Sequence, residues 1–299
     1  MRPRLRRQGS RRGRRCPRRI RRRRSDRRVD RTSLIRGLGS PAGRLLGGTS
    51  GFAYPDWAPR FYPRGLPDAN RLAFFASRLG TVELNNTFYQ RPTAERIAAW
   101  CAAVPTEFRF VVKAQRGASM RALMTTPEES VAWLTERLDG FGDRLGAVLF
   151  RLPENIHRRD DGTSDAALGR LLAAWPRSIP LVMEFLHASW HVDATFAALR
   201  EAGAVLCTTE LPDSEVPPDI RVTGTGLYLR LRRHDYTIPE LAAWAARIQP
   251  FLDAGHPAFV FFRHDDSGRA AELAAEMTAL MGGSDPETRT PGRRDQGPA

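Results

Sequence analysis

Short apolar runs alternate with helix-like stretches from residue 44 onward. The runs are rich in β-branched and aromatic residues, and they predict strands at 45–50, 81–86, 108–114, 147–153, 180–185, 204–210, 226–232 and 257–264. Apolar residues at helical spacing predict helices near 68–79, 93–104, 164–174, 191–201 and 268–281. The order of these elements is that of successive strand–helix units.

Two further helix starts carry the signature of a capping box, in which a threonine and a glutamate three residues later bond each other's backbone. Thr126 with Glu129 predicts one of them, and Thr237 with Glu240 predicts the other. The connection after 204–210 is Pro-rich and has no clear helical pattern.

Several of the predicted strands are continuous apolar runs, which is typical of a parallel sheet covered on both faces. Eight of them in strict alternation with helices predict a single-domain α/β protein, a (β/α)₈ TIM-like barrel over residues 44–282. An open, doubly wound sheet is the alternative. Because no GxGxxG or P-loop pattern follows a strand, the nucleotide-binding form of that alternative is disfavoured.

Positive charge is concentrated at the beginning of the chain. Residues 1–31 hold seventeen arginines against Asp26 and Asp30, so a formal net charge of +14 leaves the rest of the chain close to neutral. Residues 1–43 are predicted to be an Arg-rich, disordered tail, and residues 283–299 a polar, disordered one. Two interpretations of the first tail stay open, namely a nucleic-acid-binding segment and a stretch that precedes the true start codon.

No apolar run approaches the ~18 residues that a membrane span needs. Cys16, Cys101 and Cys207 lie far apart and lack metal-ligand spacing, so they are interpreted as reduced thiols. These features predict a cytoplasmic protein that makes no contact with a membrane.

Polar residues stand at the ends of the predicted strands, where a barrel of this kind gathers its functional residues. Glu83 and Glu184 are embedded in apolar runs, and a carboxylate in such a place needs a cation or a hydrogen-bond donor. Lys113 is the only lysine among forty-seven basic residues. Because arginine cannot replace a titratable or nucleophilic amine, Lys113 is a candidate for chemistry. Lys113 and the arginines of 226–232 are the expected partners of the two glutamates.

The segments GTSGFAYPDW, VELNNTFY, FRFVVKA, MEFLHASW and YLRL occur in this order, with a Leu-Pro pair after the fourth strand. Together they resemble the YecE-like family, a domain of unknown function numbered seventy-two. The resemblance implies a TIM-like barrel with a polar pocket at the strand ends, and it implies no particular reaction. It also implies that the pocket is lined or supported by Thr49, Ser50, Tyr54, Trp57, Glu83, Asn85, Thr87, Phe88, Tyr89, Lys113, Glu184, His187 and Trp190.

The first functional hypothesis is a barrel that binds or transforms a small polar or anionic metabolite. Glu83 or Glu184 would act as general base or acid, and Lys113 as an electrophilic stabiliser or Schiff-base amine. Arginines would hold carboxylate or phosphate oxygens. The predicted binding residues are Thr49, Ser50, Tyr54, Trp57, Asn85, Tyr89, Arg151, His187, Trp190, Tyr228, Arg230 and Arg232.

Two other hypotheses stay open. The first is a divalent-metal-dependent hydrolase or isomerase, with candidate ligands Glu184, His187, Glu210, His234 and His264, although no HxH or HExxH spacing is present. The second is a non-catalytic or nucleic-acid-associated binding protein that acts through the Arg-rich tail. The sequence does not identify a cofactor or an oligomeric state.

Overall fold

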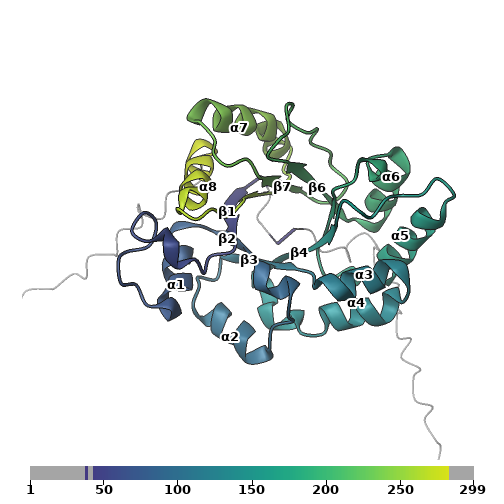
Figure 1. The fold of residues 1–299 in the computed structure, drawn as a ribbon, viewed down its shortest axis with the longest axis horizontal. Helices are drawn as coiled ribbons and strands as arrows, with labels where there is room; N and C mark the ends of the chain where they lie inside the picture. The colour runs from purple at the N-terminus through teal and green to yellow at the C-terminus, as the bar shows by residue number, and fades with distance from the viewer. Residues whose placement is uncertain (1–37, 40–42, 283–299) are drawn as a thin grey trace, which may run out of the picture.

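The computed structural model describes residues 38–39 and 43–282, so most of the two predicted tails lies outside the described residues. Eight parallel strands close into a barrel in chain order, and helices surround it (Figure 1). The strands are β1 (Leu45–Ser50), β2 (Thr81–Leu84), β3 (Arg109–Lys113), β4 (Leu145–Leu152), β5 (Leu181–Phe185), β6 (Val205–Glu210), β7 (Leu227–Leu231) and β8 (Ala258–Phe262). The predicted TIM-like barrel is confirmed.

The helices pack outside the barrel and cover the outward-facing side chains of the strands. They are α1 (Asp68–Arg78), α2 (Ala94–Ala102), α3 (Arg116–Met124), α4 (Pro127–Thr135), α5 (Thr163–Ala174), α6 (Asp193–Ala202), α7 (Ile238–Asp253) and α8 (Arg269–Leu280). Short 3₁₀ turns follow three of the strands, η2 (Pro55–Trp57), η3 (Asn85–Phe88) and η5 (Ala188–Trp190), and a fourth, η4 (Leu138–Arg144), precedes β4. No helix in the described part of the chain has the length and apolar character to cross a bilayer.

Two helix starts were predicted from capping boxes, and a third helix, α3, was not predicted. Thr237 and Glu240 form the predicted capping box at the start of α7. Helix α4 begins at Pro127 with Thr126 as its N-cap residue, which confirms the predicted start, but Thr126 makes no side-chain cap bond, so the capping box predicted there was wrong. Helix α3 was not predicted, because its buried positions are mostly small residues and its cap is a glutamine. The side chain of Gln115 accepts a hydrogen bond from the Ala118 N–H at 2.7 Å.

Alternate residues of each strand point into the barrel, where they form a packed interior rather than a pore. The part of this interior away from the carboxyl ends of the strands is an apolar cluster. It is formed by Leu38, Leu46, Val111, Ala147, Leu149, Val182, Val205, Cys207, Tyr228, Phe259 and Phe261. The helices pack against the outward-facing residues in a second, larger apolar cluster.

Leu38 and Gly39 are packed against the barrel, although they belong to the segment predicted as a tail. The Leu38 side chain is 5% exposed, and its N–H donates to Thr225 Oγ1 at 3.0 Å. The Gly39 N–H donates to the Gly146 carbonyl at 3.0 Å. These contacts anchor the chain to the barrel shortly before β1 begins.

Gly47 and Gly48 allow β1 to lie close to its neighbours. A Cβ on Gly47 would lie 2.5 Å from the Ala274 carbonyl oxygen of α8, and a Cβ on Gly48 would lie 2.2 Å from the Thr81 carbonyl oxygen of β2. Neither contact tolerates a methyl group, so the close packing of α8 and β2 on β1 requires glycine at both positions.

Candidate functional site

The inward-facing side chains at the carboxyl ends of the strands are polar, in contrast to the apolar layer below them. Strand register brings them together: Ser50 pairs with Glu83, Arg151 with Glu184, and Thr209 with Arg230. Paired positions on neighbouring parallel strands point to the same face of the sheet. We call this group the strand-end cluster, and it consists of Ser50, Glu83, Lys113, Arg151, Glu184, Thr209, Tyr228, Arg230 and Arg232.

Arg230 connects the two buried glutamates of the cluster. Its Nη1 donates to Glu184 Oε1 at 2.9 Å and to Oε2 at 2.8 Å, and its Nη2 donates to Glu83 Oε2 at 3.0 Å. The arginine is 4% exposed. Burial opposes its charge, but the two carboxylates outweigh burial and raise the pKa of Arg230 above its usual value. Arg230 is therefore a fixed cation at the centre of the site.

Glu83 is fully buried, and three donors from two strands, β1 and β7, surround its carboxylate. Oε2 accepts from Ser50 Oγ at 2.6 Å as well as from Arg230, and Oε1 accepts from the Tyr228 hydroxyl at 2.6 Å. Burial and the negative charge of Glu83 raise the pKa of Tyr228, so the phenol stays protonated and donates. The whole arrangement holds the Glu83 side chain in one orientation.

Glu184 is also fully buried, and its two oxygens are shared by three residues. Besides the two bonds from Arg230, Oε1 accepts from Thr209 Oγ1 at 2.9 Å, and Oε2 lies 3.2 Å from Arg151 Nε. Burial alone would raise the pKa of Glu184, but Arg230 and Arg151 outweigh it and lower the pKa to about 2. The geometry therefore favours Glu184 as an anchor for arginines over the general-acid role expected from sequence.

Lys113, at the end of β3, differs from the arginines because no carboxylate of the described residues lies within ion-pair distance of its Nζ. Nζ lies 4.6 Å from the centre of the Phe88 ring. Burial and the neighbouring charge of Arg230 lower the pKa of Lys113 to about 8, although Glu83 opposes the shift. The expected pairing of Lys113 with a glutamate is thus replaced by the bonds from Arg230.

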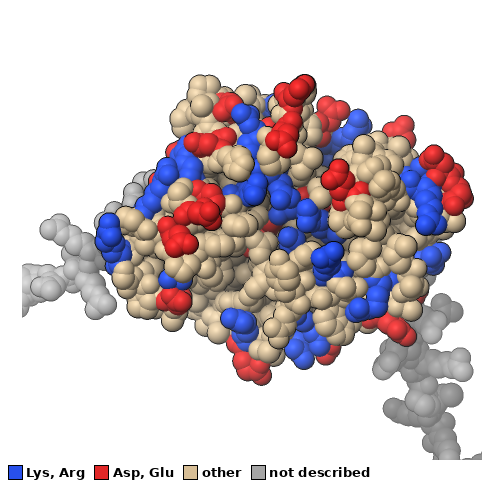
Figure 2. Space-filling model, in the orientation of Figure 1, with Lys and Arg blue, Asp and Glu red and all other residues tan. Residues whose placement is uncertain are grey.

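Arg151 and Arg232 add further positive charge and retain unused donors. Arg232 Nε is buried and has no hydrogen-bond partner among the described residues, whereas Arg151 Nε lies against Glu184 Oε2 and leaves its two terminal nitrogens for other partners. Burial and the charge of Arg230 lower the pKa of Arg232, whereas Glu184 opposes the shift. Lysine and arginine side chains gather over the centre of the barrel in the view of Figure 2. The strand-end cluster thus contains four cationic side chains and two carboxylates.

The predicted aromatic site residues lie apart from this cluster or at its edge. Trp57 and Trp190 are buried, and their Nε1 atoms donate to the carbonyls of Asp265 at 2.7 Å and Ile156 at 2.8 Å. Both therefore pack in the core. Tyr54 is half-buried and donates to the Ser50 carbonyl at 2.9 Å, whereas Tyr89 is 79% exposed. Of the predicted aromatic residues outside the strand-end cluster, Tyr54 lies against Ser50 and Phe88 lies against Lys113.

The remaining predicted polar residues take different positions. Thr49 points outward from β1, and its hydroxyl donates to the Gly51 carbonyl at 2.6 Å. Asn85 is half-buried, and its Oδ1 has no partner among the described residues. His187 bonds Ser189 Oγ through Nδ1 at 2.8 Å and stacks on His157 with ring centres 3.8 Å apart. The contacts of His187 therefore lie within its own loop and the loop after β4.

Thr209 belongs to the strand-end cluster but was not predicted from sequence, because Glu210, the last residue of the strand, is the candidate that the sequence suggests there. Alternation along β6 gives the signal: Cys207 and Thr209 face inward, so Glu210 faces outward. There the Glu210 carboxylate accepts a hydrogen bond from the Tyr236 hydroxyl. Burial raises the pKa of the Cys207 thiol well above its usual value, so the thiol is not activated as a nucleophile.

The residues considered as metal ligands are not gathered in one place. Among residues 38–39 and 43–282, no group of three His, Cys, Asp or Glu side chains is arranged to hold a metal ion. Glu210 faces away from the barrel interior, and His264 stacks on Tyr54 with ring centres 4.9 Å apart. The described residues therefore provide no geometric support for the metal-dependent alternative.

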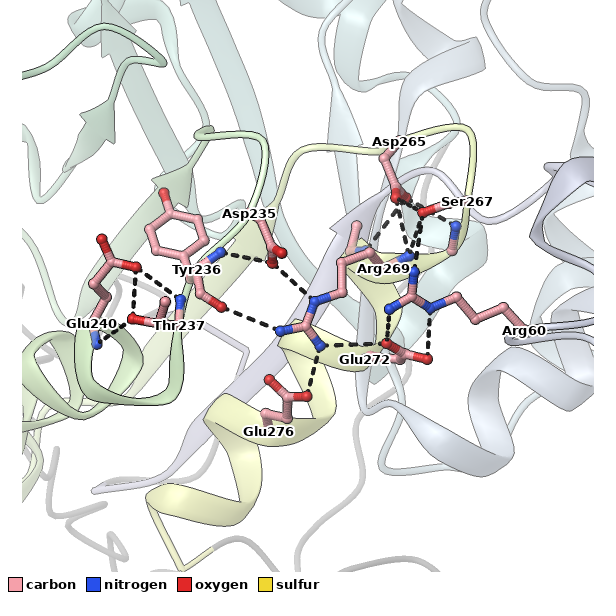
Figure 3. Close-up of polar contacts among 12 residues, drawn as sticks. Arg60, Asp235, Tyr236, Thr237, Glu240, Asp265, Ser267, Arg269, Glu272 and Glu276 are labelled. Atoms are coloured by element: carbon pink, nitrogen blue, oxygen red, sulfur yellow. Dashed lines mark hydrogen bonds and ion pairs between the residues drawn. The ribbon is translucent and has the colours of Figure 1, made fainter.

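A second polar network ties together three loops at the rim of the barrel (Figure 3). Arg269, at the start of α8, donates to Asp235 Oδ1 at 2.9 Å, to the Tyr236 carbonyl at 3.2 Å and to Glu276 Oε1 at 2.7 Å. Arg60 from the loop after β1 binds both oxygens of Glu272, at 2.8 and 2.6 Å. The loops after β1, β7 and β8 are thereby held to α8.

Comparisons with known proteins agree with this architecture. Two crystal structures of a DUF72 family protein from Enterococcus faecalis are 21% and 22% identical to the chain, with TM-scores of 0.66 and 0.65. Each covers 80% of this chain, and the matches span 95% and 98% of the other. At such identities the likeness shows the fold alone. No curated protein matches the chain.

A DUF72 family protein from Thermotoga maritima is 23% identical to the chain, with a TM-score of 0.71. The match covers 80% of this chain and 99% of the other. The family model described as "Protein of unknown function DUF72" matches residues 46–296, which confirms the family expected from sequence. The chain belongs to the DUF72 family.

Proposed function

We propose that this protein binds a small anionic ligand at the strand-end cluster. The observation that carries the proposal is the excess of positive charge there, together with the buried Nε donor of Arg232, which no described residue satisfies. Buried polar groups in proteins nearly always have a hydrogen-bond partner, so orphaned donors at one place indicate what an occupant would supply. A carboxylate or phosphate matches both the charge and the forked geometry of a guanidinium.

The rest of the cluster supports a binding role because its parts are held rigidly. Arg230 and the two glutamates form a closed set of bonds, so the three cations beside them are presented on a fixed base. Arg151 retains 25% exposure of its side chain, and Lys113 and Arg232 are half-buried. A ligand would therefore meet cations that are partly desolvated yet still accessible from the strand ends.

Calorimetric titration at low salt tests the proposal, with inorganic phosphate and pyruvate as probes. Arg232→Met is expected to weaken binding by roughly tenfold or more, because charge-assisted hydrogen bonds are lost. Arg200→Met, on the exposed face of α6, removes the same charge away from the cluster and is expected to bind like the parent. Equal affinity in the two variants, or no binding of either probe to the parent, would contradict the proposal.

We also propose a cytoplasmic location. The free thiols of Cys101 and Cys207 support it, because disulfides are rare in the cytoplasm. Nucleic-acid binding through the Arg-rich tail is a separate hypothesis on residues outside the described range. Removal of residues 1–31 distinguishes the two, because anion binding at the strand-end cluster is expected to persist without the tail.

A further inference from the structure

We propose that Lys113 forms an imine with the carbonyl group of a small 2-oxo acid whose carboxylate is held by the arginines of the strand-end cluster. This inference rests on the proposed function, because the arginines must first bind the carboxylate. It adds a covalent step and a substrate class to the binding role.

The placement of Lys113 is that of an amine available for reaction. The residue ends β3 and points into the barrel, so a rigid strand positions its backbone. Its Nζ lies over the Phe88 ring at 4.6 Å, and no described carboxylate is paired with it. A lysine in an ion pair keeps its proton, whereas an unpaired lysine that is largely buried and lies near other cations gives it up more readily.

The charged groups that face Lys113 oppose one another, and on balance they lower its pKa. Arg230 and Arg151 repel the ammonium form, while Glu83 and Glu184 attract it. Both glutamates are already bound to Arg230, so their charge is largely compensated. With a pKa of about 8, roughly a quarter of the Lys113 side chains are neutral near pH 7.5, against about a thousandth for an ordinary lysine.

A 2-oxo acid is the smallest ligand class that uses both features of the cluster. Its carboxylate matches the guanidinium forks of Arg151, whose side chain is 25% exposed, and of Arg232, whose Nε has no partner among the described residues. Its carbonyl carbon is directly bonded to that carboxylate, so a carboxylate held by the arginines brings an electrophile to the neighbouring amine. Phosphate or sulfate would satisfy the arginines and bind the ammonium form of Lys113, but neither offers an electrophilic carbon to the neutral amine.

The covalent step needs no additional reactant. The neutral amine attacks the carbonyl carbon, a C–N bond forms, and the C=O π electrons move to oxygen, which takes up a proton. The nitrogen then loses one proton and regains its lone pair, which forms the C=N bond as the hydroxyl group takes up a proton and leaves as water. In sum, a lysine ammonium and a carbonyl give a protonated imine and one water molecule.

The composition of the chain makes this step directly observable, because Lys113 is its only lysine. The full chain is incubated with pyruvate or glyoxylate, treated with sodium borohydride and analysed by mass spectrometry of the intact protein and its peptides. The expected result is one reduced adduct, located on Lys113. Lys113→Arg and Lys113→Met are expected to lose it, and Arg200→Met to retain it. Any adduct on the amino terminus serves as an internal reference.

A second arm shows whether the reaction depends on the fold. In urea Lys113 is solvated, and its adduct is expected to fall several-fold relative to that on the amino terminus. An equal ratio in native and unfolded protein would overturn the inference, as would an absence of adduct on native Lys113. If pyruvate binds in calorimetry but no adduct forms, imine formation is refuted and anion binding stands. If neither occurs, both proposals fail.

Discussion

Arg230 binds Glu184 through a single nitrogen, since Nη1 lies 2.9 Å from Oε1 and 2.8 Å from Oε2. The other terminal nitrogen, Nη2, is left to bind Glu83 at 3.0 Å. One guanidinium thus compensates two fully buried carboxylates that come from two different strands, β2 and β5. The polar layer at the strand ends depends on this one side chain.

Arg230→Met is expected to lower the free energy of unfolding by about 3–5 kcal/mol, because two buried carboxylates lose their main cation. Urea unfolding followed by circular dichroism measures the change. Arg200→Met removes an exposed arginine and is expected to stay within about 0.5 kcal/mol of the parent. A loss below about 1 kcal/mol for Arg230→Met would mean that the remaining cations compensate the glutamates without it.

Acid is expected to weaken the protein in part through Glu184. Its pKa falls from 4.5 in the unfolded chain to about 2 in the folded protein, so its contribution is complete above the unfolded value and is lost as the pH falls toward 2. Between about pH 6 and about pH 3, the parent is expected to lose about 2 kcal/mol more unfolding free energy than Glu184→Gln. Urea titrations across this range measure the difference, and parallel pH profiles would contradict it.

The barrel could be predicted from sequence because its strands are apolar runs and its helices carry ordinary spacing and caps. The ion pairs at the strand ends could be predicted only in part, because an arginine of β7 binds both glutamates as expected but Lys113 does not. Glu83 and Glu184 were expected to share Lys113 and the arginines, but strand register places Arg230 between them and leaves Lys113 without a carboxylate. Which cation reaches which anion depends on distances across the barrel, and these are set by the closed sheet.

Local context also hid parts of the structure from sequence reasoning. Leu38 follows a long run of arginines, so nothing nearby distinguishes it from the tail, although it is buried under the barrel. Glu210 was singled out by its place at the end of a strand, whereas the alternation of side chains along β6 assigns the inward position to Thr209. Counting alternate positions from the apolar interior would have identified Thr209.

Leu38 is expected to mark the true boundary of the folded domain. Leu38→Ala should cost about 2–4 kcal/mol, because it removes buried methyl groups from the base of the barrel. A chain that begins at Leu38 should unfold at the same urea concentration as the parent, and a chain that begins at Arg44 should unfold at a lower one. Equal midpoints for the two truncations would show that Leu38 and Gly39 contribute nothing to stability.

Arg269 is expected to matter more than its place on the surface of α8 suggests. It joins the loop after β7 to α8 through Asp235, the Tyr236 carbonyl and Glu276 (Figure 3). Arg269→Met should cost about 1–3 kcal/mol and increase amide hydrogen exchange in residues 232–237. Arg60→Met is the matched control, because the Arg60 side chain is 43% exposed and its pair should contribute less than about 1 kcal/mol. Similar effects of the two variants would contradict a tying role for Arg269.

Lys113→Met separates a functional lysine from a structural one. Burial and Arg230 lower the pKa of Lys113 from 10.5 to about 8, so below that pH the folded protein carries a charge that it disfavours. Its unfolding free energy should rise as the pH increases from about 8 toward 10.5, and the methionine variant should lack this rise. Near pH 7 the variant should be more stable by roughly 1–3 kcal/mol, as urea unfolding measures. A less stable variant would assign Lys113 a structural role, whereas a gain in stability would mean that the barrel keeps this amine at a cost that only ligand chemistry explains.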